Sequence, residues 1–309
     1  MRRLGWVLAL ATGCGAGAAA APGPTPPAVV AGPADPVTPA QRARWEAALA
    51  GQAVEPAEAA RDLPALEALL ASTDPALRDD LAYALLARWL LDPTLLTDAD
   101  VAGLRDRLSA RTAAVPTAGD AVFGRSFAAL TLAAVAAREV ERGAWTDAEL
   151  DAQVAAAVAY AGREVDLRGH TGLAGWAHAA AHTADWLKFL GRHPRLSAAG
   201  ATALLDGVVA LAARRHGARF SHGEDERLAA AARAILRRGL LDDAAVDAWL
   251  GRLAQPLLEP PAAAFEPVGF ATQRNARDVL VSLVAALWLD DAPAAAAALA
   301  RVRALLTGG

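Results

Sequence analysis

Three of the six histidines in the 309-residue chain lie in one stretch, RGHTGLAGWAHAAAHTADWL, residues 168 to 187. His178 and His182 are four residues apart, a spacing that places two imidazoles on one side of a helix, one turn apart. Two imidazoles at this spacing can bind one metal ion, such as zinc. Asp185, three residues further on, can be a third ligand or can orient a ring by accepting its N–H group. The stretch therefore predicts a candidate metal or acid–base site at His178, His182 and Asp185.

A helix over residues 175 to 190 would put these three side chains on one face, within an arc of about 60°. The opposite face carries Trp176, Trp186 and Leu187 and is expected to belong to the core. A glycine-rich turn just upstream adds further polar side chains. We expect a surface cavity with Trp176 at its border, lined by Asp166, Arg168, His170, His178, His182 and Asp185.

The spacing alone leaves three interpretations of these histidines open. They can bind a metal ion, although Ala179 stands where the HExxH metalloproteases have their glutamate base, which disfavours that class. They can act in acid–base chemistry or contact a substrate without a metal. They can also be packed polar residues that hydrogen-bond neighbouring helices, with Asp185 fixing their tautomers.

The motifs of this region resemble the central motif of the DUF2785 family, a set of bacterial helical proteins of undetermined function. The resemblance is carried by DLRG at 166–169, GWAH at 175–178 and AHTAD at 181–185, with weaker matches in GEDERL at 223–228, at Asn275, in DVL at 278–280 and in SL at 282–283. It spans about residues 60 to 290. It implies an all-helical fold and gives no firm indication of an activity. The signal segment and tether expected over residues 1–37 are not typical of this family.

The elements that must position these residues are helices. Helix-start signals recur along the chain, at Thr38, Asp74, Thr97, Thr146, Ser197, Ser221, Asp242 and Thr272. They predict ten to twelve helices, and no segment has the alternation of a strand. The fold class is therefore all-α, a single domain over residues 38 to 309. Helix pairs at spacings of roughly 35 to 50 residues favour a HEAT-like stack or α/α superhelix, and a compact irregular helical domain is the alternative.

Two further polar residues have structural interpretations. Glu224 follows Ser221 at the spacing of a capping box and is expected at the third position of a helix, although it can also lie near the histidines. Asn275 is expected to cap a helix or to bond a neighbouring one. The longest break between helices, residues 255 to 269, is expected to be a surface loop.

The N-terminus resembles that of a bacterial lipoprotein. Arg2 and Arg3 precede a short apolar segment, which ends in Ala-Thr-Gly before Cys14, the only cysteine in the chain. We expect residues 1–14 to be a signal segment with Cys14 as its lipidation site, and residues 15–37 to be a Pro/Gly/Ala tether. The protein would then be anchored to a membrane of the bacterial cell envelope. Cleavage in the alanine run at 18–21, giving a secreted or periplasmic soluble protein, and a cytoplasmic protein with a fortuitous apolar start are the alternatives.

Composition limits the classes of partner. The net charge is −4 and the pI about 5.9, so nucleic acid is not an expected partner. The chain has no G-x-S-x-G motif, and Ser126 lacks the context of a nucleophile. We therefore expect a binding or scaffold module for a peptide or a small molecule. The alternative is a hydrolase-like or metal-binding enzyme that uses His178, His182 and Asp185.

Overall fold

The computed structural model describes residues 37–117, 119–259 and 265–307. Within these residues the chain forms twelve α-helices, one π-helix and a short 3₁₀ turn, and it contains no strand. The all-α prediction is therefore confirmed. Cys14 and nearly all of the expected tether lie outside the described residues.

The chain divides into two compact units, Met1–Ala53 and Val54–Gly309. In the first unit, α1 (Pro39–Leu49) begins after Thr38, whose side chain forms the expected N-terminal cap in a capping box with Gln41. The remaining helices and every residue of the candidate site belong to the second unit.

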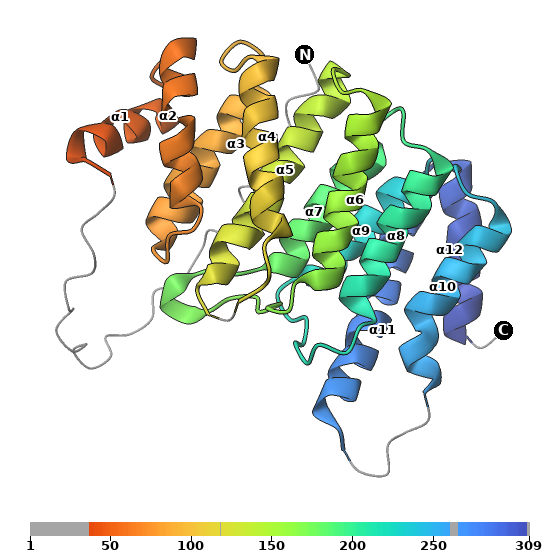
Figure 1. Ribbon diagram of the computed structural model, residues 1–309. Helices are drawn as coiled ribbons and strands as arrows, with labels where there is room; N and C mark the ends of the chain where they lie inside the picture. Colours follow the sequence, from red (N-terminus) through yellow and green to blue (C-terminus); the bar gives the residue numbers. More distant parts are fainter. Residues whose placement is uncertain (1–36, 118, 260–264, 308–309) are drawn as a thin grey trace. The chain divides into compact units, whose positions relative to one another are not determined.

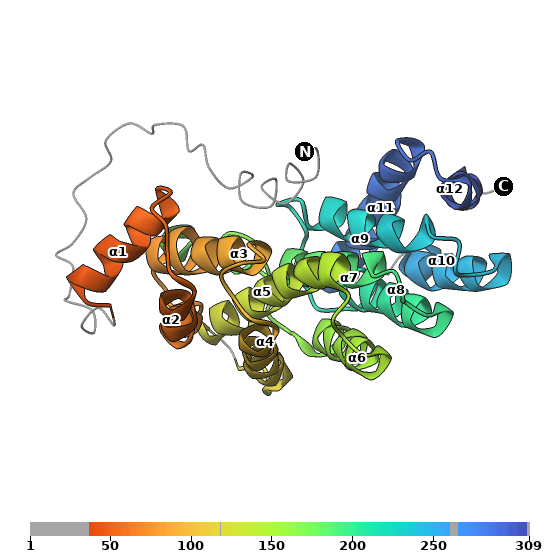
Figure 2. The same cartoon turned by 90° about the horizontal axis from the view of Figure 1, so that it is seen from above.

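Helices of the second unit alternate between two layers (Figures 1 and 2). One layer contains α4 (Asp98–Ala113), α6 (Asp147–Arg163), α8 (Ala198–Ala212) and α10 (Asp243–Leu258). The other contains α3 (Ala84–Leu91), α5 (Ala121–Arg142), α7 (Ala179–Arg192), α9 (Glu224–Leu236) and α11 (Pro267–Trp288). The chain enters this unit through α2 (Pro56–Leu69) and the π-helix η4 (Ala76–Tyr83), and it ends with α12 (Pro293–Thr307).

Neighbouring helices of one layer run parallel, and successive helices along the chain alternate in direction. Contacts near the starts of α5, α7 and α9 therefore lie at one end of the layer, as in the pairs Ser126–His182 and Asp185–Arg227. This arrangement is compatible with the expected HEAT-like stack.

A repeat is visible in the caps of the layer that contains α4. Thr97, Thr146, Ser197 and Asp242 each accept a hydrogen bond from the third residue of the helix that follows. These four starts agree with the sequence predictions and recur at intervals of roughly 50 residues, close to the length of a helical repeat.

Three predicted element boundaries outside the candidate site were wrong. Helix α11 begins at Pro267 with Glu266 as its cap, so Thr272 lies inside the helix and bonds back to the carbonyl of Val268. Helix α10 continues through Pro256 to Leu258, which shortens the predicted loop at 255–269. The start signal at Asp74 leads into the π-helix η4 rather than into an α-helix.

Helix α5 forms the centre of the core. Among the described residues it is the one helix long and apolar enough to cross a membrane, but 94% of its most apolar window is buried inside the protein. Its apolarity is therefore explained by packing. Helix α7 lies beside it, with Trp186 and Leu187 fully buried as predicted.

Candidate functional site

A short hairpin-like turn, and not a helix, precedes α7. The N–H groups of Ala177 and His178 donate to the carbonyls of Gly169 and Arg168, at 3.0 and 2.9 Å, and one bridge joins His170 to Trp176. The expected helix from Gly175 is therefore wrong. Gly175 has φ of 72°, and a Cβ atom there would lie 2.9 Å from the side chain of Pro75, so the turn needs glycine at this position.

His178 stands at the junction between this turn and α7. Its φ of 51° is the one positive φ of a non-glycine residue among those described, and it makes His178 the N-cap of the helix. A left-handed backbone costs about 1–2 kcal/mol in a residue with a Cβ atom, and such strain concentrates at functional sites. His178 therefore does not share a helical face with His182, although their ring centroids lie 5.7 Å apart.

A buried arginine fixes the turn from the side of η4. The guanidinium of Arg78, which is fully buried, donates to the carbonyls of Ser72 and Ala174, both at 2.8 Å, and lies 4.1 Å from the centre of the Phe123 ring. These contacts tie the turn before α7 to a separate part of the helical stack. Arg78 therefore fixes the position of the turn that precedes α7.

Glu224 lies against His178. Its Oε1 atom is 3.3 Å from Nε2 of His178, and its Oε2 atom accepts the backbone N–H groups of Ser221 and His222 at 3.1 and 2.8 Å. Nε2 of His178 also lies 3.2 Å from the carbonyl of His222, so it faces two acceptors and carries a proton. The backbone of Gly169 closes over the pair, because a Cβ atom there would lie 2.8 Å from the carboxylate.

The Glu224 carboxylate is ionised. Burial raises its pKa, but the hydrogen bonds from His178 and from the backbone N–H groups of His222 and Glu224 outweigh this effect and lower the pKa to about 2. The predicted capping box is wrong, since Gly223 caps α9 and Glu224 is its first residue. The other interpretation of Glu224, a place beside the histidines, is the one that the structure supports.

His182 is held from the opposite side by α5. Its Nδ1 atom lies 2.8 Å from Oγ of Ser126, and Ser126 donates its own proton to the carbonyl of Ala177. Nδ1 is therefore the protonated nitrogen, and Nε2 carries the lone pair. Burial lowers the pKa of His182 well below its ordinary value, and the charges of His178, Arg227 and Arg78 lower it further.

The outer part of the site is a group of rings around Trp176. The indole stacks on His178 with centroids 4.6 Å apart, and it meets His170 and His222 nearly at right angles, at 4.8 and 5.5 Å. Trp176 is half-buried, whereas His170 and His222 are exposed. The prediction that Trp176 belongs to the core is therefore wrong. We call the whole group the histidine cluster: His170, Trp176, His178, His182, His222 and Glu224.

Three of the predicted site residues have other partners. Both oxygens of the buried Asp185 bind cations, Oδ1 to Lys188 at 2.5 Å and Oδ2 to Arg227. Asp166 and Arg168 form an ion pair with each other, 2.6 Å between Oδ2 and Nη2, on the turn before the cluster. The charged groups of these three residues are therefore bound by partners other than the histidines.

Metal binding at the predicted triad is limited by the same geometry. Asp185 is not placed to join His178 and His182, and the described residues contain no group of three or more His, Cys, Asp or Glu side chains arranged to hold a metal ion. The two imidazoles do have a feature of metal ligands, because the second nitrogen of each is held by an acceptor, Glu224 or Ser126.

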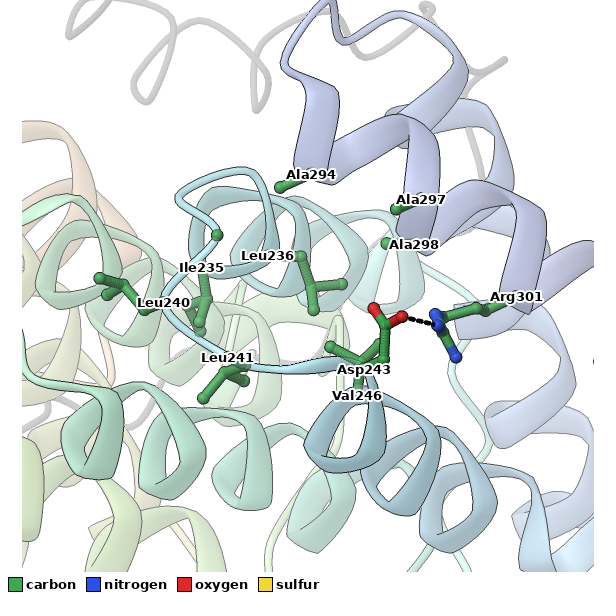
Figure 3. A pocket seen from close by; sticks show the side chains of 11 residues that line it. Ile235, Leu236, Leu240, Leu241, Asp243, Val246, Ala294, Ala297, Ala298 and Arg301 are labelled. Atoms are coloured by element: carbon green, nitrogen blue, oxygen red, sulfur yellow. Dashed lines mark ion pairs between the residues drawn. The ribbon is translucent and has the colours of Figure 1, made fainter.

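The cavity in Figure 3 lies away from the cluster. It has a volume of about 90 Å³ between α9, α10 and α12, and its lining includes Leu236, Leu241 and Ala298. Its main polar feature is the ion pair between Asp243 and Arg301, at 2.6 Å (Figure 3). No residue of the histidine cluster lines it.

Sequence reasoning missed His222 and misplaced Glu224. Both come from the loop before α9, and neither has a helical spacing that relates it to His178. The GEDERL match at 223–228 contains Glu224, which was interpreted as a capping residue, and no motif of the sequence contained His222. Asn275 was expected to cap a helix or to bond a neighbouring one, but it lies inside α11 and binds the loop before α9, where it accepts the N–H of Phe220 and donates to the carbonyl of Ala218.

Comparison with known proteins identifies the family to which the chain belongs. The sequence model described as "Protein of unknown function (DUF2785)" matches residues 116–285, more than half of the chain. This span is narrower than the 60–290 expected from the motifs, but it contains the whole histidine cluster. Searches of the curated proteins and of the solved structures found no match.

Proposed function

The chain belongs to the DUF2785 family, which is described as having no known function, and from the site itself we propose that it is a ligand-binding helical module. The ligand, a peptide or a small molecule, would contact the exposed edge of the histidine cluster. One observation carries the proposal: Trp176 contacts two exposed imidazoles, His170 on the strained turn before α7 and His222 on the loop before α9.

Several properties of this surface favour binding. An indole offers a large apolar area together with an N–H donor, and such residues dominate binding energies at recognition sites. His170 and His222 add nitrogen donors and acceptors beside it. The buried members Glu224, His178 and His182 hold the surface in one geometry, which reduces the entropy lost on binding.

A ligand-observed NMR screen of dipeptides and of small heterocycles, amines and carboxylates tests the proposal. Trp176→Ala is expected to raise the dissociation constant of bound compounds about tenfold or more, because a central aromatic contact is lost. Trp288→Ala is the matched control, because Trp288 is 70% exposed at the end of α11, away from the cluster. Binding that survives Trp176→Ala, or that Trp288→Ala weakens equally, contradicts the proposal.

The second candidate is an acid–base or metal-dependent enzyme. The observation that favours it is the ionised Glu224 against Nε2 of His178, since a carboxylate in this position orients an imidazole for proton transfer. In such an enzyme Glu224, and not Asp185 as expected from the sequence, would be the carboxylate that orients a histidine ring. Stoichiometric zinc in protein purified without chelator, lost in His182→Ala, would support the metal form of this candidate.

We also propose that Cys14 anchors the protein to a membrane of the cell envelope. The support is the sequence pattern around this single cysteine. Mass spectrometry of the N-terminal peptide and fractionation of the Cys14→Ser variant test it. A lipid-modified Cys14 and release of the variant from membranes are expected, and an unmodified, soluble wild-type protein contradicts the anchor.

A further inference from the structure

A second charged feature lies along α7 and α9, which run side by side (Figure 1). Cationic side chains from both helices gather there, although the whole chain has a net charge of −4 and a single lysine. We call them the cationic row: Lys188 and Arg192 from α7, with Arg227, Arg233 and Arg237 from α9 and its end.

Only two carboxylates form ion pairs with these five cations among the described residues. Asp185 binds both Lys188 and Arg227. Asp290 binds Nε of Arg233 at 2.7 Å and Nε of Arg237 at 3.0 Å, through the same oxygen. Positive charge therefore exceeds negative charge along the row.

Arg192 is the member without a carboxylate. Among the described residues no acidic group lies within ion-pair distance of it, and its guanidinium lies 5.0 Å from the centre of the Phe189 ring. Desolvation by neighbouring groups lowers the pKa of Arg192, the charges of Arg233 and Arg237 lower it further, and the charge of Asp185 opposes them. Burial lowers the pKa of Lys188, the charge and the hydrogen bond of Asp185 oppose this effect in part, and the charges of Arg227 and Arg192 lower the pKa further. Like charges repel one another less when an anion lies between them, and Arg192 has no carboxylate bound to it among the described residues.

Hydrogen-bond donors remain free along the row. Arg233 and Arg237 contact Asp290 through Nε, so their Nη groups have no acceptor among the described residues. Nε of Arg227 is buried and also lacks a partner there. Guanidinium groups with free Nη atoms bind phosphate oxygens in pairs, and a phosphate dianion offers enough oxygens for several of them.

We propose that the cationic row is a binding site for a phosphate group, with Arg192 as its central contact. The phosphate belongs either to a soluble small molecule or to a lipid headgroup. The site is separate from the histidine cluster and does not depend on the function proposed for that cluster.

Calorimetry with inorganic phosphate and pyrophosphate tests the site on the wild-type protein, against chloride at matched ionic strength. Vesicles of phosphatidylcholine, with and without phosphatidylglycerol, test the lipid source. Arg192→Gln is the informative variant. Arg252→Gln is its control, because Arg252 is 47% exposed and pairs with Asp206 away from the row.

Loss of one charge-assisted contact is expected to weaken binding about tenfold in Arg192→Gln and to leave Arg252→Gln unchanged. Binding of the soluble anions identifies a small-molecule phosphate, and binding confined to phosphatidylglycerol vesicles identifies a headgroup. Without phosphate, Arg192→Gln is expected to melt no lower than the wild type, since it removes a repulsive charge. Absence of all binding, or equal binding by the wild type and Arg192→Gln, overturns the proposal.

Discussion

The Nε2 atom of His178 lies 3.3 Å from the Oε1 atom of Glu224 and thereby joins the start of α7 to the start of α9. Because the two helices run parallel in one layer, their first residues meet at the same end of the stack. The contact also fixes the position of the Trp176 ring, which stacks on His178. The orientation of the Trp176 ring therefore depends on the buried carboxylate of Glu224, which belongs to a different helix.

The first prediction concerns the charge on Glu224. Its pKa of about 2 in the folded protein is below the ordinary 4.5, so its contribution to stability is complete above pH 4.5 and is lost as the pH falls toward 2. We expect Glu224→Gln to remove this contribution, on the order of 3 kcal/mol. Urea unfolding of both proteins across this range measures it. Parallel curves of stability against pH would show that Glu224 is not held as the structure indicates.

His182 gives a second pH dependence, of the same sign but in a higher range. Since its pKa in the folded protein is lowered, the unfolded chain takes up the proton first, and stability falls as the pH drops below the ordinary 6.5. His182→Gln is expected to reduce this slope. Histidine NMR is expected to show His182 neutral, with the proton on Nδ1, at about pH 6. A protonated His182 at that pH contradicts the interpretation.

Ser126 is predicted to be a structural partner and not a nucleophile, because its hydroxyl is fully buried between His182 and the carbonyl of Ala177. Ser126→Ala leaves both groups without this partner and is expected to cost about 1–3 kcal/mol of unfolding free energy. Thr131→Val is the control in the same helix, where the hydroxyl only bonds back to Phe127. Equal effects of the two changes would contradict a special role for Ser126.

The backbone of His178 can be tested separately from its ring. Both His178→Ala and His178→Gly remove the imidazole, but glycine tolerates the left-handed backbone and alanine does not. His178→Gly is expected to be the more stable variant by about 1 kcal/mol in chemical denaturation. A more stable alanine variant would place His178 inside a regular helix, as its sequence pattern first suggests.

The helices could be predicted because local signals determine them. Thr97, Thr146, Ser197 and Asp242 each cap the helix expected after them. The apolar period of α7 predicted the buried face with Trp186 and Leu187, but the face with His182 and Asp185 is buried as well, which the period did not predict.

The site could be predicted only in part, since its geometry depends on contacts between distant segments. Gly175 can continue a helix by composition, but its positive φ and the hydrogen bonds of the following residues to Gly169 and Arg168 form a turn instead. The partner of His178 is Glu224 rather than Asp185, because parallel packing brings the start of α9 to the start of α7. The spacing of residues within one helix cannot predict this contact between two helices.

The most direct test of the ligand-binding proposal is a histidine-resolved NMR titration of the wild-type protein with a compound from the screen. The resonances of His170, His178 and His222 are expected to shift together, because these rings contact Trp176. His193 and His216 lie elsewhere and are internal controls, expected to stay unchanged. Shifts confined to His193 or His216, with the three cluster rings unaffected by a bound compound, would contradict ligand binding at the histidine cluster.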